Sequence, residues 1–110
     1  MPRKTKRNTV IFQDEVLELS FHKYGNGRPA IELICDDGGP YATATVNMVD
    51  AMPAKDCVFI KDYSENEGML DSLVKAGVVE PTGVMVRAGF VRVPEARLLP
   101  PYAAMARKAA

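Results

Sequence analysis

Two glycine-rich clusters divide the first half of the chain into three segments in which polar and apolar residues alternate. The clusters are residues 25–28 and 36–39, and the segments are residues 16–23, 30–35 and 41–47. Glycine, asparagine and aspartate tolerate the backbone angles of tight hairpin turns. Alternation with a period of two is typical of strands that bury one face. The three segments are therefore predicted to form an antiparallel meander.

Two more segments resemble strands. Residues 9–12 form a short apolar run before the meander, and residues 57–61 form another after a proline-containing loop. Both contain the β-branched and aromatic residues that are enriched in strands. We expect them to extend the sheet.

Glycine and proline punctuate the last third of the chain. Residues 81–83 (Pro-Thr-Gly) are predicted to form a turn. Residues 84–88 then alternate, and Gly89 is expected to mark a bulge or a close backbone approach in a strand that resumes over residues 90–93. Pro94 is expected to lie at the edge or end of that strand.

The clearest local signal predicts a helix at about residues 65–76. Ser64 stands three residues before Glu67, which is the spacing of a capping box, so the Ser64 hydroxyl is expected to accept a hydrogen bond from a helix amide. Gly77 is suited to a left-handed residue at the end of the helix. The apolar face has helical spacing and consists of Met69, Leu70, Leu73 and Val74.

These elements predict an α+β fold, a mainly antiparallel sheet of short strands in a meander, with one helix packed on a face. A small barrel-like sheet capped by the helix is the alternative. A chain of 110 residues has room for one domain, which we place at residues 9–99. Residues 1–8 form a basic arm, and residues 100–110 form a proline- and alanine-rich tail, expected to be a frayed helix or disordered.

Composition excludes several classes of protein. Hydrophobic residues make up 47% of the chain and charged residues 25%, and no apolar run approaches 18 residues, which argues against global disorder and a membrane span. Asp14 and Glu15 interrupt the hydrophobic residues that follow the basic N-terminus, so a signal peptide is not expected. We therefore expect a cytoplasmic protein in which Cys35 and Cys57 are free thiols.

The residues that could carry catalysis or bind a metal are sparse. His22 is the single histidine, and its neighbours on the strand face, Glu18 and Ser20, form the polar row typical of a solvent-facing strand. Two cysteines and one histidine do not give the ligand spacing of a zinc site. Residues 36–39 lack the alternating ligands of a calcium loop, and no glycine-rich phosphate loop is present. We expect no enzyme, no metal and no cofactor.

The formal net charge of zero conceals an uneven distribution, with nine acidic and two basic residues between positions 29 and 71. Some carboxylates near the helix start would favour the helix dipole. A basic surface, either a nucleic-acid-binding groove on a host protein or this chain's own basic arm, could neutralise the rest. A merely solvated surface is the other interpretation. The residues proposed for this partner-binding acidic face are Asp62, Glu65, Glu67 and Asp71.

The basic N-terminal arm suggests a different partner. Its cations could contact nucleic-acid phosphates in a manner that is independent of base sequence and sensitive to salt, or they could simply keep a flexible end in solution. The four residues are Arg3, Lys4, Lys6 and Arg7.

Four segments resemble an uncharacterised family of small bacterial proteins, associated with phages, plasmids and conjugative elements and described as a domain of unknown function. They are residues 41–47 (YATATVN), 59–68 (FIKDYSENEG), 73–77 and 89–91, within a resembling region of roughly 30–98. The resemblance implies a mobile-element accessory protein that binds and modulates or inhibits a host protein, possibly of a defence or replication system, and it supplies no catalytic residues. Nucleic-acid binding through the basic arm is the alternative function.

Overall fold

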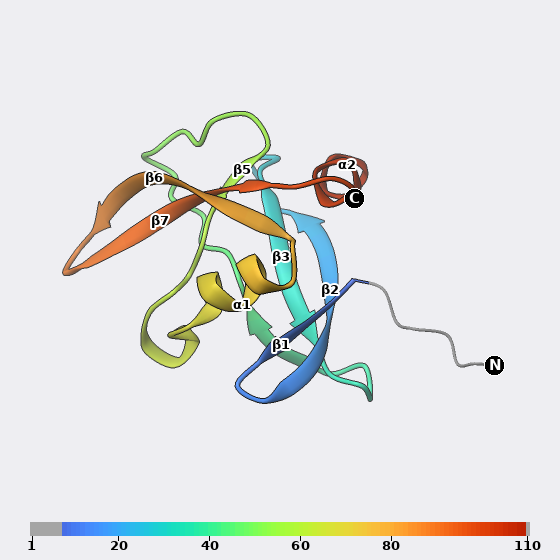
Figure 1. Cartoon of the computed structure of the whole chain (residues 1–110). Coiled ribbons are helices and arrows are strands. Elements are labelled where there is room, and N and C mark those ends of the chain that lie inside the picture. The colour runs from blue at the N-terminus through green and yellow to red at the C-terminus, as the bar shows by residue number, and fades with distance from the viewer. Residues whose placement is uncertain (1–7, 110) are drawn as a thin grey trace.

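The computed structural model describes residues 8–109 and has an α+β fold, as the sequence predicted. It contains two antiparallel sheets in place of one (Figure 1). The first has the order β1 (Thr9–Phe12), β2 (Glu15–Lys23), β3 (Pro29–Ile34), β4 (Pro40–Thr43). The second has the order β5 (Cys57–Phe59), β7 (Val91–Leu98), β6 (Val79–Ala88). The helical elements are the 3-10 turn η1 (Ser64–Asn66), α1 (Met69–Lys75) and α2 (Tyr102–Lys108).

The first sheet is the predicted meander with one strand added. In the turn between β2 and β3, the Tyr24 amide donates to the Arg28 carbonyl at 2.8 Å, and Gly27 has a φ of +86° that suits glycine. β1 joins β2 through a two-residue turn at Gln13 and Asp14, whose φ angles are +53° and +64°. Two consecutive positive φ angles give the turn a twist that matches a hairpin.

The second sheet corrects the prediction for the last third of the chain. Gly89 and Phe90 form the turn of a hairpin, since Ala88 pairs with Val91, and the irregularity in the ladder lies instead between Pro81 and Met85. The sequence predicts a turn at residues 81–83 and a bulge at Gly89, whereas the structure has the irregularity at the first place and the turn at the second. Glycine at φ +62° suits the tight turn, whereas Pro81 is tolerated in β6 because β6 is an edge strand.

The sequence predicts that Pro94 lies at the edge or end of its strand, but the structure places it inside the strand. β7 continues to Leu98 and is the central strand of its sheet. Pro94 lies opposite Met85, beside the irregular part of the ladder, a position in which a strand tolerates proline. Its carbonyl accepts a hydrogen bond from the Ile60 amide at 2.9 Å.

The start of α1 also differs from the prediction. Residues 64–66 form the separate turn η1, and α1 begins only at Met69. Ser64 has a φ of +55°. The N-cap residue of α1 is Gly68, which makes no side-chain cap hydrogen bond. The cap comes from Asp62, whose Oδ1 accepts from the amides of Gly68 at 3.1 Å and Leu70 at 2.9 Å. A carboxylate has replaced the expected hydroxyl because the extra turn moves Ser64 away from the free amides of the helix.

The end of α1 is as predicted. Gly77 has a φ of +76°, and its amide donates to the Val74 carbonyl at 3.0 Å while the Val78 amide donates to the Leu73 carbonyl at 3.0 Å. These two bonds define a Schellman motif. Lys75 in the last turn adds a favourable charge at the carboxyl end of the helix.

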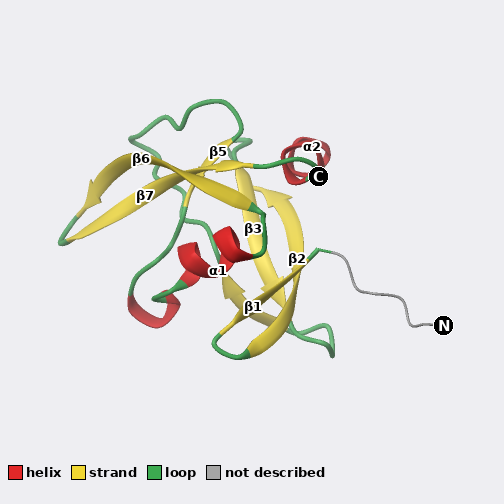
Figure 2. Ribbon diagram, in the orientation of Figure 1, coloured by secondary structure: helices red, strands yellow, loops and turns green. Residues whose placement is uncertain are grey.

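The C-terminal segment is a packed helix. α2 lies against the first sheet (Figure 2), and its Ala103 and Ala106 are buried. The Tyr102 ring stacks on Phe21 of β2, with 6.2 Å between ring centroids. The folded part therefore extends beyond residue 99, and within residues 8–109 no helix is long and apolar enough to cross a membrane.

The hydrophobic core lies where the two sheets and the helices meet. An isolated bridge between Thr45 and Ile60 links the segments that connect the sheets. Asn66 is only 2% exposed, and its Nδ2 donates to the Thr43 carbonyl at 2.7 Å, which ties η1 to the end of β4. The largest fully buried apolar side chains are Leu17, Ile31, Leu33, Ile60, Met69 and Leu73.

Candidate functional site

The four residues of the predicted acidic face lie in one segment, at η1 and the start of α1. Three of them have partners within the fold. Asp62 caps α1, Glu65 Oε2 lies 2.7 Å from the Nζ of Lys61, and Asp71 Oδ2 lies 3.1 Å from the Nζ of Lys75. Only Glu67 has no side-chain partner among residues 8–109. Much of this negative charge is therefore already compensated locally.

The pKa values agree with this local compensation. The hydrogen bond from Lys61 lowers the pKa of Glu65 below its usual value. The same bond raises the pKa of Lys61. Both members of the Lys61–Glu65 pair are charged at neutral pH. The surface there carries a dipole and not an isolated carboxylate.

The polar row on β2 does not have the geometry of a catalytic triad. His22 Nε2 lies 2.8 Å from Ser20 Oγ and 3.4 Å from Glu32 Oε1, so a single ring nitrogen faces both groups. A triad needs the nucleophile on one ring nitrogen and the orienting carboxylate on the other. The row remains on an exposed face of the strand.

The cysteines are free thiols, as predicted. Burial, with a smaller contribution from Glu95, raises the pKa of Cys57, and burial, with a smaller contribution from Asp37, raises that of Cys35. Both thiols are therefore protonated at neutral pH and poor nucleophiles. Within the described part of the chain, no three His, Cys, Asp or Glu side chains are grouped closely enough to hold a metal ion. The predicted nucleic-acid-binding residues 3–7 lie outside the described residues.

Among residues 8–109, the most exposed apolar side chain is one that the sequence did not single out. Phe90 stands at the tip of the β6–β7 hairpin, which projects from the rest of the molecule (Figure 1), and its relative exposure is 107%. Val84 and Met85 of β6 are each 49% exposed. A two-residue connection that begins with glycine suits a type II′ hairpin turn, so Gly89 and Phe90 were compatible with a hairpin as well as with the predicted bulge.

Two arginines lie beside this apolar tip. Arg87 and Arg92 are direct partners across the β6–β7 ladder, so their side chains project from the same face of the sheet. Neither forms an ion pair with any residue between 8 and 109. Like charges directly opposite each other destabilise a strand pair, so this arrangement is costly for folding and is not compensated within the described chain.

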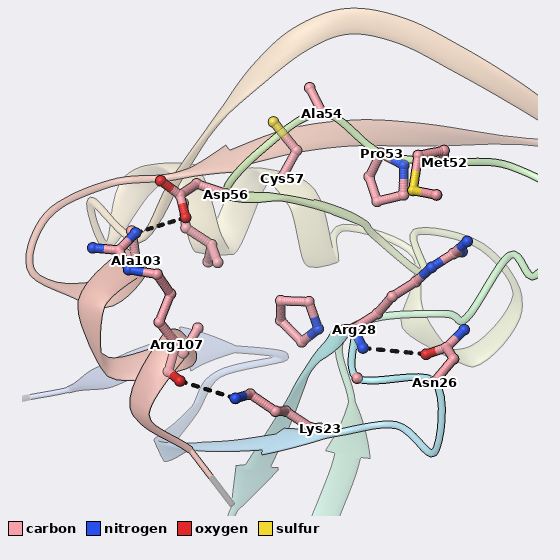
Figure 3. A pocket seen from close by; sticks show the side chains of 14 residues that line it. Lys23, Asn26, Arg28, Met52, Pro53, Ala54, Asp56, Cys57, Ala103 and Arg107 are labelled. Carbon is pink, nitrogen blue, oxygen red and sulfur yellow. Dashed lines mark hydrogen bonds and ion pairs between the residues drawn. The ribbon is translucent and has the colours of Figure 1, made fainter.

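A cleft of about 610 Å³ is lined by residues outside the hairpin tip (Figure 3). The β2–β3 turn, the loop around Met52 and Pro53, and α2 surround it. Lys23 ends β2, Arg28 lies in the β2–β3 turn, and Arg107 comes from the helix. No local sequence pattern predicts this cleft, because its walls come from segments far apart in the chain.

The comparisons with known proteins give no match: no family model, no curated protein and no solved structure is similar to this chain.

Proposed function

We propose that this chain is a non-enzymatic accessory protein of a mobile element that binds and modulates a host protein, and that the tip of the β6–β7 hairpin makes the contact. The observation that carries the binding part is the full exposure of Phe90 beside the Arg87–Arg92 pair. The origin in a mobile element rests on the family resemblance of residues 30–98.

The hairpin has the composition of a binding hot spot. Aromatic and arginine side chains are enriched among the residues that dominate binding energy, and they cluster at the centre of an interface. Phe90 supplies an apolar side chain that can enter a pocket, while Met85 is exposed on the face that carries the arginines. An isolated exposed side chain would need no explanation, but here apolar and cationic groups are combined on one projecting element.

The hairpin also defines the chemistry of its partner. A complementary surface has an apolar pocket for Phe90 and carboxylates that face Arg87 and Arg92. Such carboxylates would relieve the repulsion between the arginines. The expected host protein is therefore acidic around its pocket. This differs from the basic partner that the acidic face would favour, and the local pairing of Glu65 and Asp71 supports the hairpin over that face.

The alternative function is nucleic-acid binding through the basic arm at residues 1–8, and the arm's sequence is its support. Removal of residues 1–8 should abolish both the affinity for nucleic acid and its salt dependence if this function holds. Absence of binding to duplex and single strands at low salt would exclude it.

The principal experiment captures partners from the native host with the full chain, followed by mass spectrometry. The captured partner is then titrated with Phe90→Ala, the double variant R87Q/R92Q and the triple variant D62N/E65Q/D71N. We expect Phe90→Ala to weaken binding at least thirtyfold, corresponding to about 2 kcal/mol for a hot-spot side chain. The arginine variant should also reduce the salt dependence of the association rate.

Ile11→Ala is the matched control, since Ile11 is an apolar side chain with 65% exposure on β1. It should leave the affinity unchanged. If the triple acidic variant weakens binding and the hairpin variants do not, the contact belongs to the acidic face, and the assignment to the hairpin is wrong.

A further inference from the structure

The walls of the cleft come from four parts of the chain that meet only in the folded protein. The start of β3 contributes Pro29, the end of β7 contributes Leu98, and α2 contributes Ala103 and Ala106. The volume of about 610 Å³ is within the range of sites that hold small organic ligands. Met52 from the loop opposite is 81% exposed although it lines the cleft. An apolar ligand would remove part of this side chain from water.

Three cations lie around this apolar lining, and only one of them is neutralised. Arg107 Nη1 lies 2.7 Å from Asp56 Oδ1 (Figure 3). Lys23 and Arg28 form no ion pair with any residue between 8 and 109. The lining therefore carries a net positive charge, with Asp56 as its single carboxylate.

The hydrogen bonds that these cations make hold the cleft in shape and leave donors unused. Lys23 Nζ donates to the Arg107 carbonyl at 2.9 Å, which fastens α2 to the β2–β3 turn. Arg28 Nη1 donates to the Met48 carbonyl at 2.6 Å, which fastens the loop before β5. A guanidinium has five N–H donors and an ammonium has three. Lys23 and Arg28 can therefore keep these hydrogen bonds to the backbone and still donate to an anion.

We propose that this cleft binds a small organic anion, with an apolar body against Pro29, Leu98 and Met52 and a carboxylate or phosphate head held by Arg28. The guanidinium of Arg28 presents paired donors that match either head group. Lys23, at the end of β2 beside α2, adds to the attraction. This site is independent of the hairpin, because none of its lining residues belongs to the projecting tip.

A series of probes with one apolar chain and different head groups tests the site on the unaltered protein. Octanoate, octyl phosphate, octanol and octylammonium are titrated while the backbone amide signals are followed by NMR. We expect both anions to bind with amide shifts at Gly27, Ala54 and Ala103, octanol at least tenfold more weakly, and octylammonium more weakly still. The relative affinity of octanoate and octyl phosphate identifies the head group. Equal affinities for the anions, octanol and octylammonium, or shifts outside the cleft, would overturn the proposal.

Variants locate the charge that holds the head group. Arg28→Gln should weaken octanoate binding about tenfold, the loss expected for one charge-assisted hydrogen bond, and Lys23→Gln should weaken it less. Arg92→Gln makes the same chemical change at the tip of the hairpin and should leave octanoate affinity unchanged. If Arg28→Gln and Arg92→Gln bind octanoate equally well, Arg28 does not hold the anion.

Failure of these titrations would leave the proposed function untouched, because the partner contact is measured with Phe90 variants. Conversely, the octanoate titration remains informative if no host protein is captured.

Discussion

The two ends of the β6–β7 hairpin differ sharply although they belong to the same two strands. At the base, Val79, Ala96 and Leu98 are buried in the core. At the tip, Phe90 is fully exposed, and Arg87 and Arg92 face each other without a carboxylate among the described residues. The base is arranged for folding, whereas the tip retains apolar area and charge that folding does not use.

The base and the tip of the hairpin also differ in how their charged side chains are partnered. Glu95 at the base is 6% exposed, and its Oε1 accepts from the Thr82 hydroxyl at 2.7 Å while its Oε2 accepts from the Ala54 amide at 2.9 Å. A buried carboxylate is tolerated when it is hydrogen-bonded in this way. The arginines at the tip lack such partners within the described chain. The charges at the tip are therefore exposed to water without a partner among residues 8–109, whereas the carboxylate at the base is hydrogen-bonded within the fold.

The largest expected effect tests whether stability resides at the base. Leu98→Ala should lower the free energy of unfolding by about 2–5 kcal/mol, because it removes a buried side chain and leaves a cavity. Phe90→Ala should change it by less than about 0.5 kcal/mol, since the side chain is already in water. Urea unfolding of the two variants measures both values. Similar losses of stability for the two variants would show that Phe90 contributes to the core as Leu98 does, and the contrast between base and tip would be wrong.

The next effect tests the satisfied carboxylate. Glu95→Ala removes both carboxylate oxygens, so the Thr82 hydroxyl and the Ala54 amide lose their side-chain acceptor, at a cost of about 1–3 kcal/mol. A double-mutant cycle with Thr82→Val isolates the side-chain pair. A coupling energy indistinguishable from zero would contradict the Thr82–Glu95 bond. The R87Q/R92Q variant provides the contrast at the tip, where neutralisation should not destabilise the protein.

A third prediction concerns Asp62 in the acidic segment. Its carboxylate accepts hydrogen bonds within the fold, as that of Glu95 does at the base of the hairpin. Asp62→Ala should cost about 1 kcal/mol through loss of the helix cap. Ser64→Ala should change stability by less than about 0.5 kcal/mol because its hydroxyl does not cap α1. Chemical denaturation monitored by circular dichroism compares the two. A larger loss for Ser64→Ala would restore the capping box that the sequence predicted.

A smaller effect of opposite sign is expected at the tip. Arg87→Glu places opposite charges across the β6–β7 ladder and should stabilise the protein by about 0.2–1 kcal/mol. The same variant should weaken binding to an acidic partner. Thermal unfolding at low salt measures the gain, which should diminish as salt screens the pair. Destabilisation by Arg87→Glu would show that Arg87 has a structural role.

The smallest effect is the pH dependence of the Lys61–Glu65 pair. Its bond lowers the pKa of Glu65 in the folded state. The pair therefore stabilises the fold above the carboxyl pKa of the unfolded chain, and this contribution is lost as pH falls through the lower folded-state value. The loss should be slight, because the Glu65 side chain is 69% exposed. Unfolding curves of the wild type and Glu65→Gln between pH 2 and 7 should converge at the acidic end, and a constant difference would exclude the linkage.

Local patterns in the sequence were sufficient for several parts of the fold. Alternation and the turn at residues 25–28 predicted the β2–β3 hairpin, and Gly77 predicted the end of α1. These features depend on neighbouring residues, since a turn and a Schellman motif are built from backbone angles and bonds within a few positions. The α+β class followed from the same periodicities.

Other outcomes depended on contacts between distant segments. Ser64 and Asp62 were both plausible near a helix start, and the extra turn η1, tied down by Asn66 at the Thr43 carbonyl, decided that Asp62 caps α1. The turn at Gly89 was distinguishable from a bulge only by the pairing of Ala88 with Val91. In each case two local conformations were compatible with the residues, and long-range bonds selected one.

The sequence by itself determined which segments alternate, where glycine permits the chain to turn and which residues carry charge. Only the tertiary structure decided which of those charges remain available, because an ion pair or cap depends on a partner brought close by folding. It joined Lys23, Asp56 and Arg107 around one cleft and left Arg87 facing Arg92 at the exposed tip. Distances in space, which set electrostatic energies, are not encoded in the spacing of charges along the chain.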